Sequence, residues 1–310
     1  MNSSLLSTVI TTMNLVLTKT VLRPTMPAID GYLLALCDLF ETIDSSRNDT
    51  LTSPSPQALH ELRIAIRRAR SILREGKKVL PEEIFAAMSQ DLSWLSSITS
   101  EARNLDTLVD NWPAYERLIE PKDVNHLHAL VREIHHRRSV VYQDMRAQLN
   151  GQRVITLINE WQVFMLDGVN VDKNGVLAQR MLKEVVTEQI SRAHRKFVSD
   201  CGEITNKSSD HDVHTLRKDA KRIRYMAESF HELLSTKKEK TLLAKLLTLQ
   251  DNLGEIQDLR VHEEILEDTI PYLRSMSANS TITAAEELLA QMARRRRKLR
   301  KKVIEGVLRA

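Results

Sequence analysis

Two basic segments of the chain share one residue pattern. HELRIAIRRAR covers residues 60–70 and HTLRKDAKRIR covers residues 214–224. Each begins with His, has Leu and Arg at the third and fourth positions, and carries a base at the eighth, ninth and eleventh positions. Arg presents a planar fork of donors that suits phosphate oxygens, and His can donate one hydrogen bond or become cationic beside a phosphate. The pattern therefore predicts binding of a phosphate-rich anion.

The spacing of these bases places most of them on one face of a helix. At about 100° per residue, the histidine and most of the bases of each segment fall within about a quarter of the helix circumference. We call the two faces stripe 1 and stripe 2. Stripe 1 consists of His60, Arg63, Arg67, Arg70 and Arg74, and stripe 2 consists of His214, Arg217, Lys221 and Arg224. The opposite face of the first helix is apolar and is the expected core face, formed by Leu62, Ala65, Ile66, Ala69 and Leu73.

Acids are not regularly placed at the i+4 positions of the stripes, as they are on an ordinary solvated helix, so the stacked cations repel one another unless an anion is present. Further bases nearly fill residues 294–302. Candidate ligand-binding bases outside the stripes are Arg222, Arg294, Arg297 and Lys301. An alternative is pairing of the bases with acids of the following helices, at Glu101, Asp106, Glu255 and Asp258, but these acids are too few to neutralise both stripes and the C-terminal bases.

The two segments are parts of a longer internal repeat. The offset of 154 residues also aligns Leu80 with Leu234, Glu101 with Glu255, and Leu105 with Leu259, without an insertion. We interpret the chain as a duplication with a first half at about 25–168 and a second half at about 176–308. The segment DGVNVDKNG at 167–175 is rich in turn-forming residues and divides them.

The apolar residues recur at helical spacing, and alternating β-branched segments are scarce, so the sequence predicts an all-α fold. We expect helices at 27–48, 56–78, 82–110 and 122–149 in the first half, and at 176–200, 211–235, 238–269 and 282–308 in the second. Ser55 before Pro56 suits the start of the first motif helix, and Asp210 or Asp212 is expected to cap the second. Four helices per half predict two antiparallel four-helix bundles related by a pseudo-two-fold axis.

Composition sets further bounds on the kind of protein. The 310 residues carry a formal net charge of +4, and aromatic residues make up only 4%. The two cysteines, Cys37 and Cys201, give neither a disulfide framework nor a metal-ligand spacing, which fits the cytoplasm. The sequence contains no apolar stretch of about 20 residues that could span a membrane. We expect residues 1–24 to be a poorly anchored N-terminal leader, although its Ser and Thr content is also typical of a transit peptide.

The two motif segments resemble those of the CHAD family, the conserved histidine α-helical domain. The segments that follow them, SSITSEARNLDTLV and LQDNLGEIQDLRVHEEIL, are similar to a further family segment of the approximate form Leu-Gly-x-x-Arg-Asp-x-Asp. The resemblance covers about 25–308. It implies two four-helix bundles with a basic groove between them, and binding of inorganic polyphosphate, in bacteria at polyphosphate granules. This chain departs from the pattern at Thr99, Ser100, Asn104 and Gln257.

We expect no catalysis, no cofactor and no metal, and we keep two alternatives. A helical metal-dependent phosphohydrolase would use His211 and Asp212 with His126, His128 or His135, but the surroundings are basic and do not favour a metal. The chain also lacks a Gly-rich phosphate loop and a nucleophile elbow. A nucleic-acid-binding protein would share the electrostatics, yet the aromatic residues are too few and scattered to form base-stacking platforms.

Overall fold

The computed structural model describes residues 21–167, 175–205, 208–234, 237–276 and 278–307. Most of the predicted leader at 1–24 and of the predicted turn at 167–175 lies outside these ranges. The described residues form helices and their connections, with one isolated β-bridge between Pro27 and Met181. The prediction of an all-α fold is therefore confirmed.

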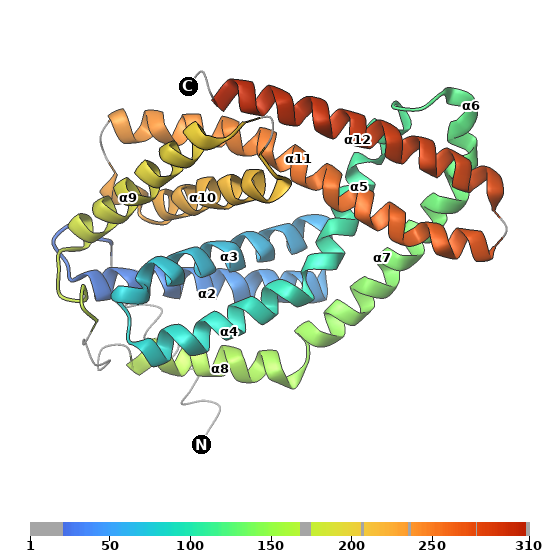
Figure 1. Cartoon of the computed structure of the whole chain (residues 1–310). Coiled ribbons are helices and arrows are strands. Elements are labelled where there is room, and N and C mark those ends of the chain that lie inside the picture. Colours follow the sequence, from blue (N-terminus) through green and yellow to red (C-terminus); the bar gives the residue numbers. More distant parts are fainter. Residues whose placement is uncertain (1–20, 168–174, 206–207, 235–236, 277, 308–310) are drawn as a thin grey trace. The chain divides into compact units, whose positions relative to one another are not determined.

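The helices follow the chain in the order labelled in Figure 1. They are α2 (Ala28–Thr52), α3 (Pro56–Glu75), α4 (Glu82–Ile98), α5 (Ser100–Glu116), α6 (Pro121–Val124), α7 (His128–Leu149), α8 (Gln152–Asp167), α9 (Leu182–Glu203), α10 (Asp210–Ser229), α11 (Lys237–Ser275) and α12 (Asn279–Val307). Short 3-10 turns lie at Gly76–Lys78, Asn125–Leu127 and His231–Leu233.

The first half contains more helices than the sequence predicts. The expected helix at 82–110 is two helices, α4 and α5, separated at the buried Thr99. Leu95 before this break and Ala102 after it are both buried, so the apolar periodicity continues across the break and conceals it. Helix α8 was not predicted at all, although its buried Val154 and Leu157 have helical spacing.

The chain folds into two compact units, and neither consists of one sequence half. Unit 1 contains Met1–Ser96, Leu149–His194 and Arg222–Leu242, and unit 2 contains Ser97–Gln148, Arg195–Lys221 and Leu243–Ala310. Each unit thus combines segments of both halves of the proposed repeat. Helix α10 carries stripe 2 and contributes its first turns to unit 2 and its last turns to unit 1.

Unit 1 has its core between α2, α3, α8 and the end of α10. The rings of Tyr32 on α2 and Phe230 have centroids 5.1 Å apart, and Phe40 on α2 stacks on Trp161 of α8 at 4.1 Å. Figure 1 shows α2, α3, α4 and α8 side by side. Helix α3 begins as predicted, because the Ser55 side chain accepts a hydrogen bond from the Ala58 N–H at 3.1 Å.

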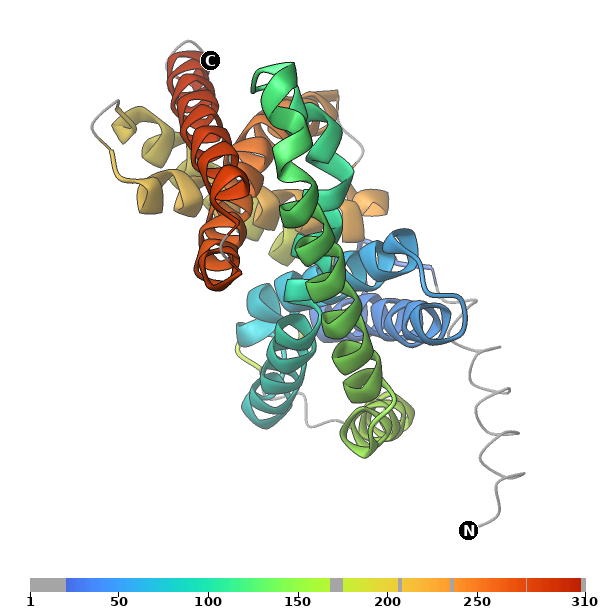
Figure 2. The same ribbon diagram turned by 90° about the vertical axis from the view of Figure 1, so that its right-hand side faces the viewer.

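Unit 2 has a core formed by α5, α7, the second part of α11, and α12. Residues contributed by these helices include Leu108, Leu130, Leu266 and Leu288, all fully buried. The second part of α11 and α12 run side by side in both views (Figures 1 and 2). Among the described helices, none is long and apolar enough to cross a membrane.

The start of α10 is capped differently from the prediction. The hydroxyl of Ser209 accepts a hydrogen bond from the Asp212 N–H at 3.2 Å, and the Asp212 carboxylate accepts one from the Ser209 N–H at 2.7 Å. This reciprocal pair is a capping box in which Ser209 is the cap and Asp212 closes it. Asp212 therefore takes part in capping, whereas Asp210 forms ion pairs with α12.

Candidate polyanion-binding site

Stripe 1 lies along α3 within unit 1. The predicted core face is confirmed, because Leu62, Ala65, Ile66, Ala69 and Leu73 are all buried. On the stripe, His60 and Arg67 are half-buried, and Arg70 and Arg74 are exposed. The apolar face thus fixes α3 against the core and leaves most of stripe 1 accessible to a ligand.

Arg63 differs from the other members of stripe 1, because it is only 7% exposed. Its Nη1 donates to the Ser96 carbonyl oxygen at 3.1 Å, near the end of α4. Burial limits the contact that this guanidinium can make with a large anion, although its positive charge still contributes to the local field. Arg63 therefore lies beneath the accessible part of stripe 1.

The accessible bases of stripe 1 lack acidic partners. Within the described residues, Arg67, Arg70 and Arg74 form no ion pair. Among the described residues, Arg70 donates to two hydroxyls, those of Ser96 at 3.0 Å and Ser93 at 3.4 Å. Burial lowers the pKa of Arg70, and repulsion by the charge of Arg67 lowers it further. An anion that bridges these two side chains would relieve that repulsion.

The C-terminal part of α10 packs in unit 1 through ion pairs. Arg222 pairs with Glu75 of α3, and Arg68 of α3 pairs with Glu228 of α10 at 2.8 Å. Glu228 also pairs with Arg224. Two of the predicted binding residues, Arg222 and Arg224, therefore already have acidic partners, which reduces the positive charge they offer to a ligand.

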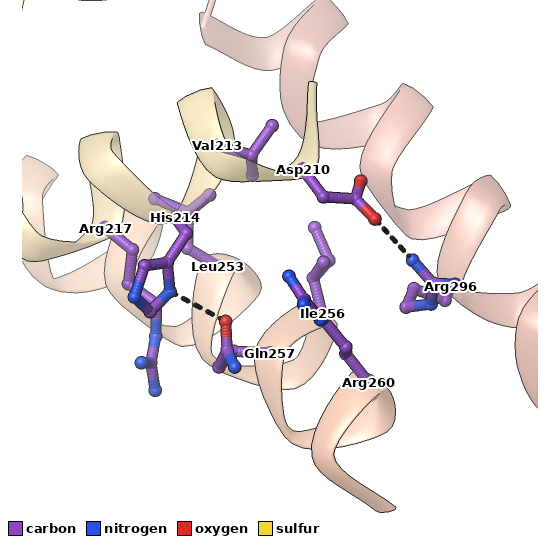
Figure 3. Close-up of a pocket in the computed structure, with 9 residues that line it drawn as sticks. All are labelled: Asp210, Val213, His214, Arg217, Leu253, Ile256, Gln257, Arg260 and Arg296. Atoms are coloured by element: carbon purple, nitrogen blue, oxygen red, sulfur yellow. Dashed lines mark hydrogen bonds and ion pairs between the residues drawn. The ribbon is translucent and has the colours of Figure 1, made fainter. Parts of the chain in front are cut away.

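The N-terminal part of stripe 2 lines a hollow in unit 2 (Figure 3). His214 and Arg217 project from α10, and Gln257 and Arg260 reach toward them from α11. Nδ1 of His214 lies 2.8 Å from Oε1 of Gln257. The enclosed space is only about 10 Å³, so the hollow presents donors to a ligand at the surface and does not enclose one.

The electrostatic surroundings of His214 are basic. Burial lowers the pKa of the ring, the hydrogen bond to Gln257 raises it, and the charges of Lys218, Arg217 and Arg260 lower it. Two acids are nearby: Asp210 also lines the hollow, and Oδ1 of Asp258 lies 4.0 Å from Nη2 of Arg217. Lys221, also on stripe 2, is half-buried in unit 2. Positive charge therefore dominates this part of stripe 2.

Three possible hydrogen-bond donors that line this hollow were not predicted as binding residues: Gln257, Arg260 and Arg296. Gln257 and Arg260 are three residues apart on α11 and so share a helix face, which is a signal the sequence contains. Arg296 of α12 pairs with Glu263 at 3.1 Å and with Asp210 at 2.9 Å, which holds α12 to α11 and α10. No sequence pattern indicates those long-range partners.

The basic run at 294–302 divides into two sets. Arg295 pairs with Glu255 at 2.6 Å, and Arg296 and Arg300 pair with acids of unit 2. The predicted binding residues belong to the other set: Arg294 and Arg297 are exposed, and Lys301 is exposed with a distant pair to Glu305 at 3.9 Å. None of these three lines the hollow beside His214.

A larger hollow in unit 2, of about 670 Å³, lies between the segment before α7 and the start of α12. Its lining mixes acids and bases, and includes Arg117, Glu120, Asp123, His126 and Glu287. The acids make it unsuited to a polyanion, so this larger hollow is not our candidate site. In the part of the chain that the structure describes, no group of three His, Cys, Asp or Glu residues could hold a metal ion.

The fold and these surfaces define the class of protein. It is an all-α protein with two basic helix faces, each of which begins with a histidine. A model of the CHAD domain family matches residues 34–267. The chain therefore belongs to the CHAD domain family.

Two solved structures resemble the whole chain. The CHAD domain from the plant Ricinus communis is 23% identical, with 94% of each chain covered and a TM-score of 0.76. PptA from Streptomyces chartreusis is 15% identical, with 92% of this chain and 100% of that chain covered, and a TM-score of 0.69. At these identities the likeness shows the fold alone. A search of curated proteins finds no match.

Proposed function

We propose that the protein binds inorganic polyphosphate through stripe 1 and stripe 2, without cleaving it, in the cytoplasm and at polyphosphate granules. The observation that carries this proposal is the run of Arg67, Arg70 and Arg74, which lack acidic partners among the described residues. A chain of closely spaced phosphates supplies the countercharge that these guanidinium groups lack. The CHAD resemblance, which implies polyphosphate as ligand, supports the same conclusion.

Two observations weigh against the alternatives. Asp212, the best candidate ligand of a metal-dependent phosphohydrolase, accepts hydrogen bonds at the cap of α10, and these lower the pKa of its carboxyl. The tryptophans give little support to base stacking, because Trp112 and Trp161 are buried and the Arg153 guanidinium covers the Trp94 ring at 3.9 Å. The proposal requires no divalent metal, since the protein itself supplies the positive charge.

A competition assay tests the ligand class. Labelled long-chain polyphosphate bound to the full-length protein is displaced with unlabelled polyphosphate, tripolyphosphate, single-stranded DNA or heparin. We expect unlabelled long-chain polyphosphate to compete at the lowest concentration of phosphate groups. Stronger competition by DNA would replace the proposal with nucleic-acid binding.

A pair of variants with equal net charge tests the site. Arg67→Ala with Arg70→Ala removes two accessible charges of stripe 1. Lys183→Ala with Arg192→Ala removes two exposed charges from the part of α9 that belongs to unit 1. We expect at least a tenfold loss of affinity in the first variant and a change below about twofold in the second. Equal losses would show that net charge, not stripe 1, determines binding.

A further inference from the structure

The hydrogen bond between His214 and Gln257 defines where the neutral imidazole carries its proton. The Gln257 atom that faces Nδ1, at 2.8 Å, is Oε1, and an amide oxygen only accepts hydrogen bonds. Nδ1 must therefore be the donor. In a neutral imidazole the other nitrogen, Nε2, then carries a lone pair and is an acceptor.

This tautomer determines how the ring meets a phosphate. Phosphate oxygens are acceptors, so Nε2 of neutral His214 cannot bond to them, and protonation converts it to a charged donor. We propose that Gln257 is a positioning residue that holds His214 with its proton on Nδ1, so that the ring binds a phosphate oxygen only when it takes up a second proton at Nε2. This inference rests on the proposed function, because it assigns a protonation step to the same site.

The charged groups around the ring oppose protonation in the absence of a ligand. Arg217 and Lys218 lie on its own helix, and Arg260 reaches it from α11. Asp258 of α11 is close to Arg217, and on the α12 side Arg296 is paired with Asp210. Burial, which has the largest effect, and the neighbouring bases lower the pKa of His214 by more than the hydrogen bond to Gln257 raises it, so the ring is neutral at neutral pH until a phosphate brings negative charge.

The two halves of the repeat differ at the position of Gln257. The offset of 154 residues that relates His60 to His214 relates Arg103 to Gln257. A guanidinium only donates hydrogen bonds, so Arg103 cannot accept a hydrogen bond from an imidazole as Gln257 does. We therefore assign this proton uptake to His214 in the second half.

Nuclear magnetic resonance of the imidazole tests the tautomer without any ligand. In two-bond ¹H–¹⁵N spectra of the full-length protein at pH 8, we expect a protonated Nδ1 and an unprotonated Nε2 for His214. Gln257→Leu removes the acceptor, and the signals should shift toward the tautomer protonated at Nε2. A proton on Nε2 in the wild-type protein would overturn the inference, whether or not polyphosphate binds.

Calorimetry tests the proton uptake that the tautomer implies. Titration with long-chain polyphosphate at pH 7.5, in buffers of different ionisation enthalpy, gives the number of protons taken up. We expect His214→Gln to lower that number by up to about one proton per protein molecule. Gln257→Glu should also lower it, because a carboxylate beside Nδ1 charges the ring before the ligand arrives.

The outcomes separate the two proposals. Binding with the same proton uptake in the wild-type protein, His214→Gln and Gln257→Glu would overturn the role of Gln257 and leave the proposed function intact. Absence of any polyphosphate binding would overturn the proposed function and the uptake step with it, while the spectra would still decide the tautomer.

Discussion

Arg222 of α10 donates from Nη2 to Oε2 of Glu75 on α3 at 2.8 Å. Arg68 of α3 pairs in turn with Glu228 of α10. Arg68 and Arg222 are equivalent across the offset of 154 residues, so each motif helix directs an equivalent arginine to an acid of the other within unit 1. The acids are not equivalent, because the offset relates Glu75 to Ser229 and Glu228 to Arg74. The arginines alone therefore agree with the proposed duplication.

We predict that Arg222 contributes more to stability than to binding. The Glu75 side chain is 7% exposed, so Arg222→Met leaves a nearly buried carboxylate without its partner, which costs about 2 kcal/mol of unfolding free energy. Urea denaturation measures this loss. The double variant Arg222→Met with Glu75→Met should recover most of it, and a single variant as stable as the wild type would contradict the structural role.

Polyphosphate binding should weaken steeply as salt rises, because each phosphate neutralised by a base releases counterions. We expect Arg67→Ala with Arg70→Ala to reduce the slope of log affinity against log salt concentration by about 2, on the relation established for nucleic acids. The α9 variant with Lys183→Ala and Arg192→Ala serves as control and should keep the wild-type slope. An unchanged slope in the stripe 1 variant would show that these two guanidinium groups do not contact phosphates.

Binding should also tighten between pH 8 and pH 6 as imidazoles gain protons. Burial lowers the pKa of the ligand-free His214 ring below the usual value for histidine, and a bound phosphate raises it, so its share of the tightening extends over the pH range in which the ring is protonated only in the complex. His60→Gln with His214→Gln should flatten the pH response and keep most of the salt dependence, since the Arg and Lys charges remain. A double variant with the wild-type pH response would show that neither histidine contacts the ligand.

His262 should make the protein less stable in acid. Its ring is fully buried in unit 2, where Nδ1 lies 2.6 Å from the Tyr115 hydroxyl and Nε2 lies 3.1 Å from that of Thr107. Burial lowers the pKa of His262 to about 4, below its value in the unfolded chain, so the unfolded state binds the proton more tightly. The stabilisation is present above about pH 6.5 and is lost as pH falls toward 4.

Urea denaturation at pH 7 and pH 5 measures this effect. The free energy of unfolding of the wild-type protein should fall by about 2 kcal/mol more than that of His262→Gln, because other titrating groups contribute equally to both proteins. An equal fall in the two proteins would show that His262 is not the acid-sensitive group.

Local periodicity predicts most of the helices, although not α8 or the break between α4 and α5. It also predicts the orientation of stripe 1, because burial of Leu62 and Ile66 requires the bases to lie on the other side of α3. It does not predict which bases have partners. Arg63 is buried because it reaches a carbonyl oxygen of Ser96, and Arg295 is paired because the fold brings Glu255 to it. These contacts join residues 33 and 40 positions apart, so helical spacing cannot indicate them.

The length of stripe 1 limits the ligands that it can distinguish. From His60 to Arg74 the helix rises by about 21 Å, with about one base per turn of 5.4 Å. A phosphate chain shorter than this distance leaves some bases without an anion, so affinity per molecule should increase with chain length until the ligand extends along all of α3. In polyphosphate, with about one charge per phosphate, neighbouring charges lie closer together than the bases of stripe 1, which occur about once per helix turn. Bound polyphosphate therefore remains a net anion along its outer edge, able to attract further cations from the solution.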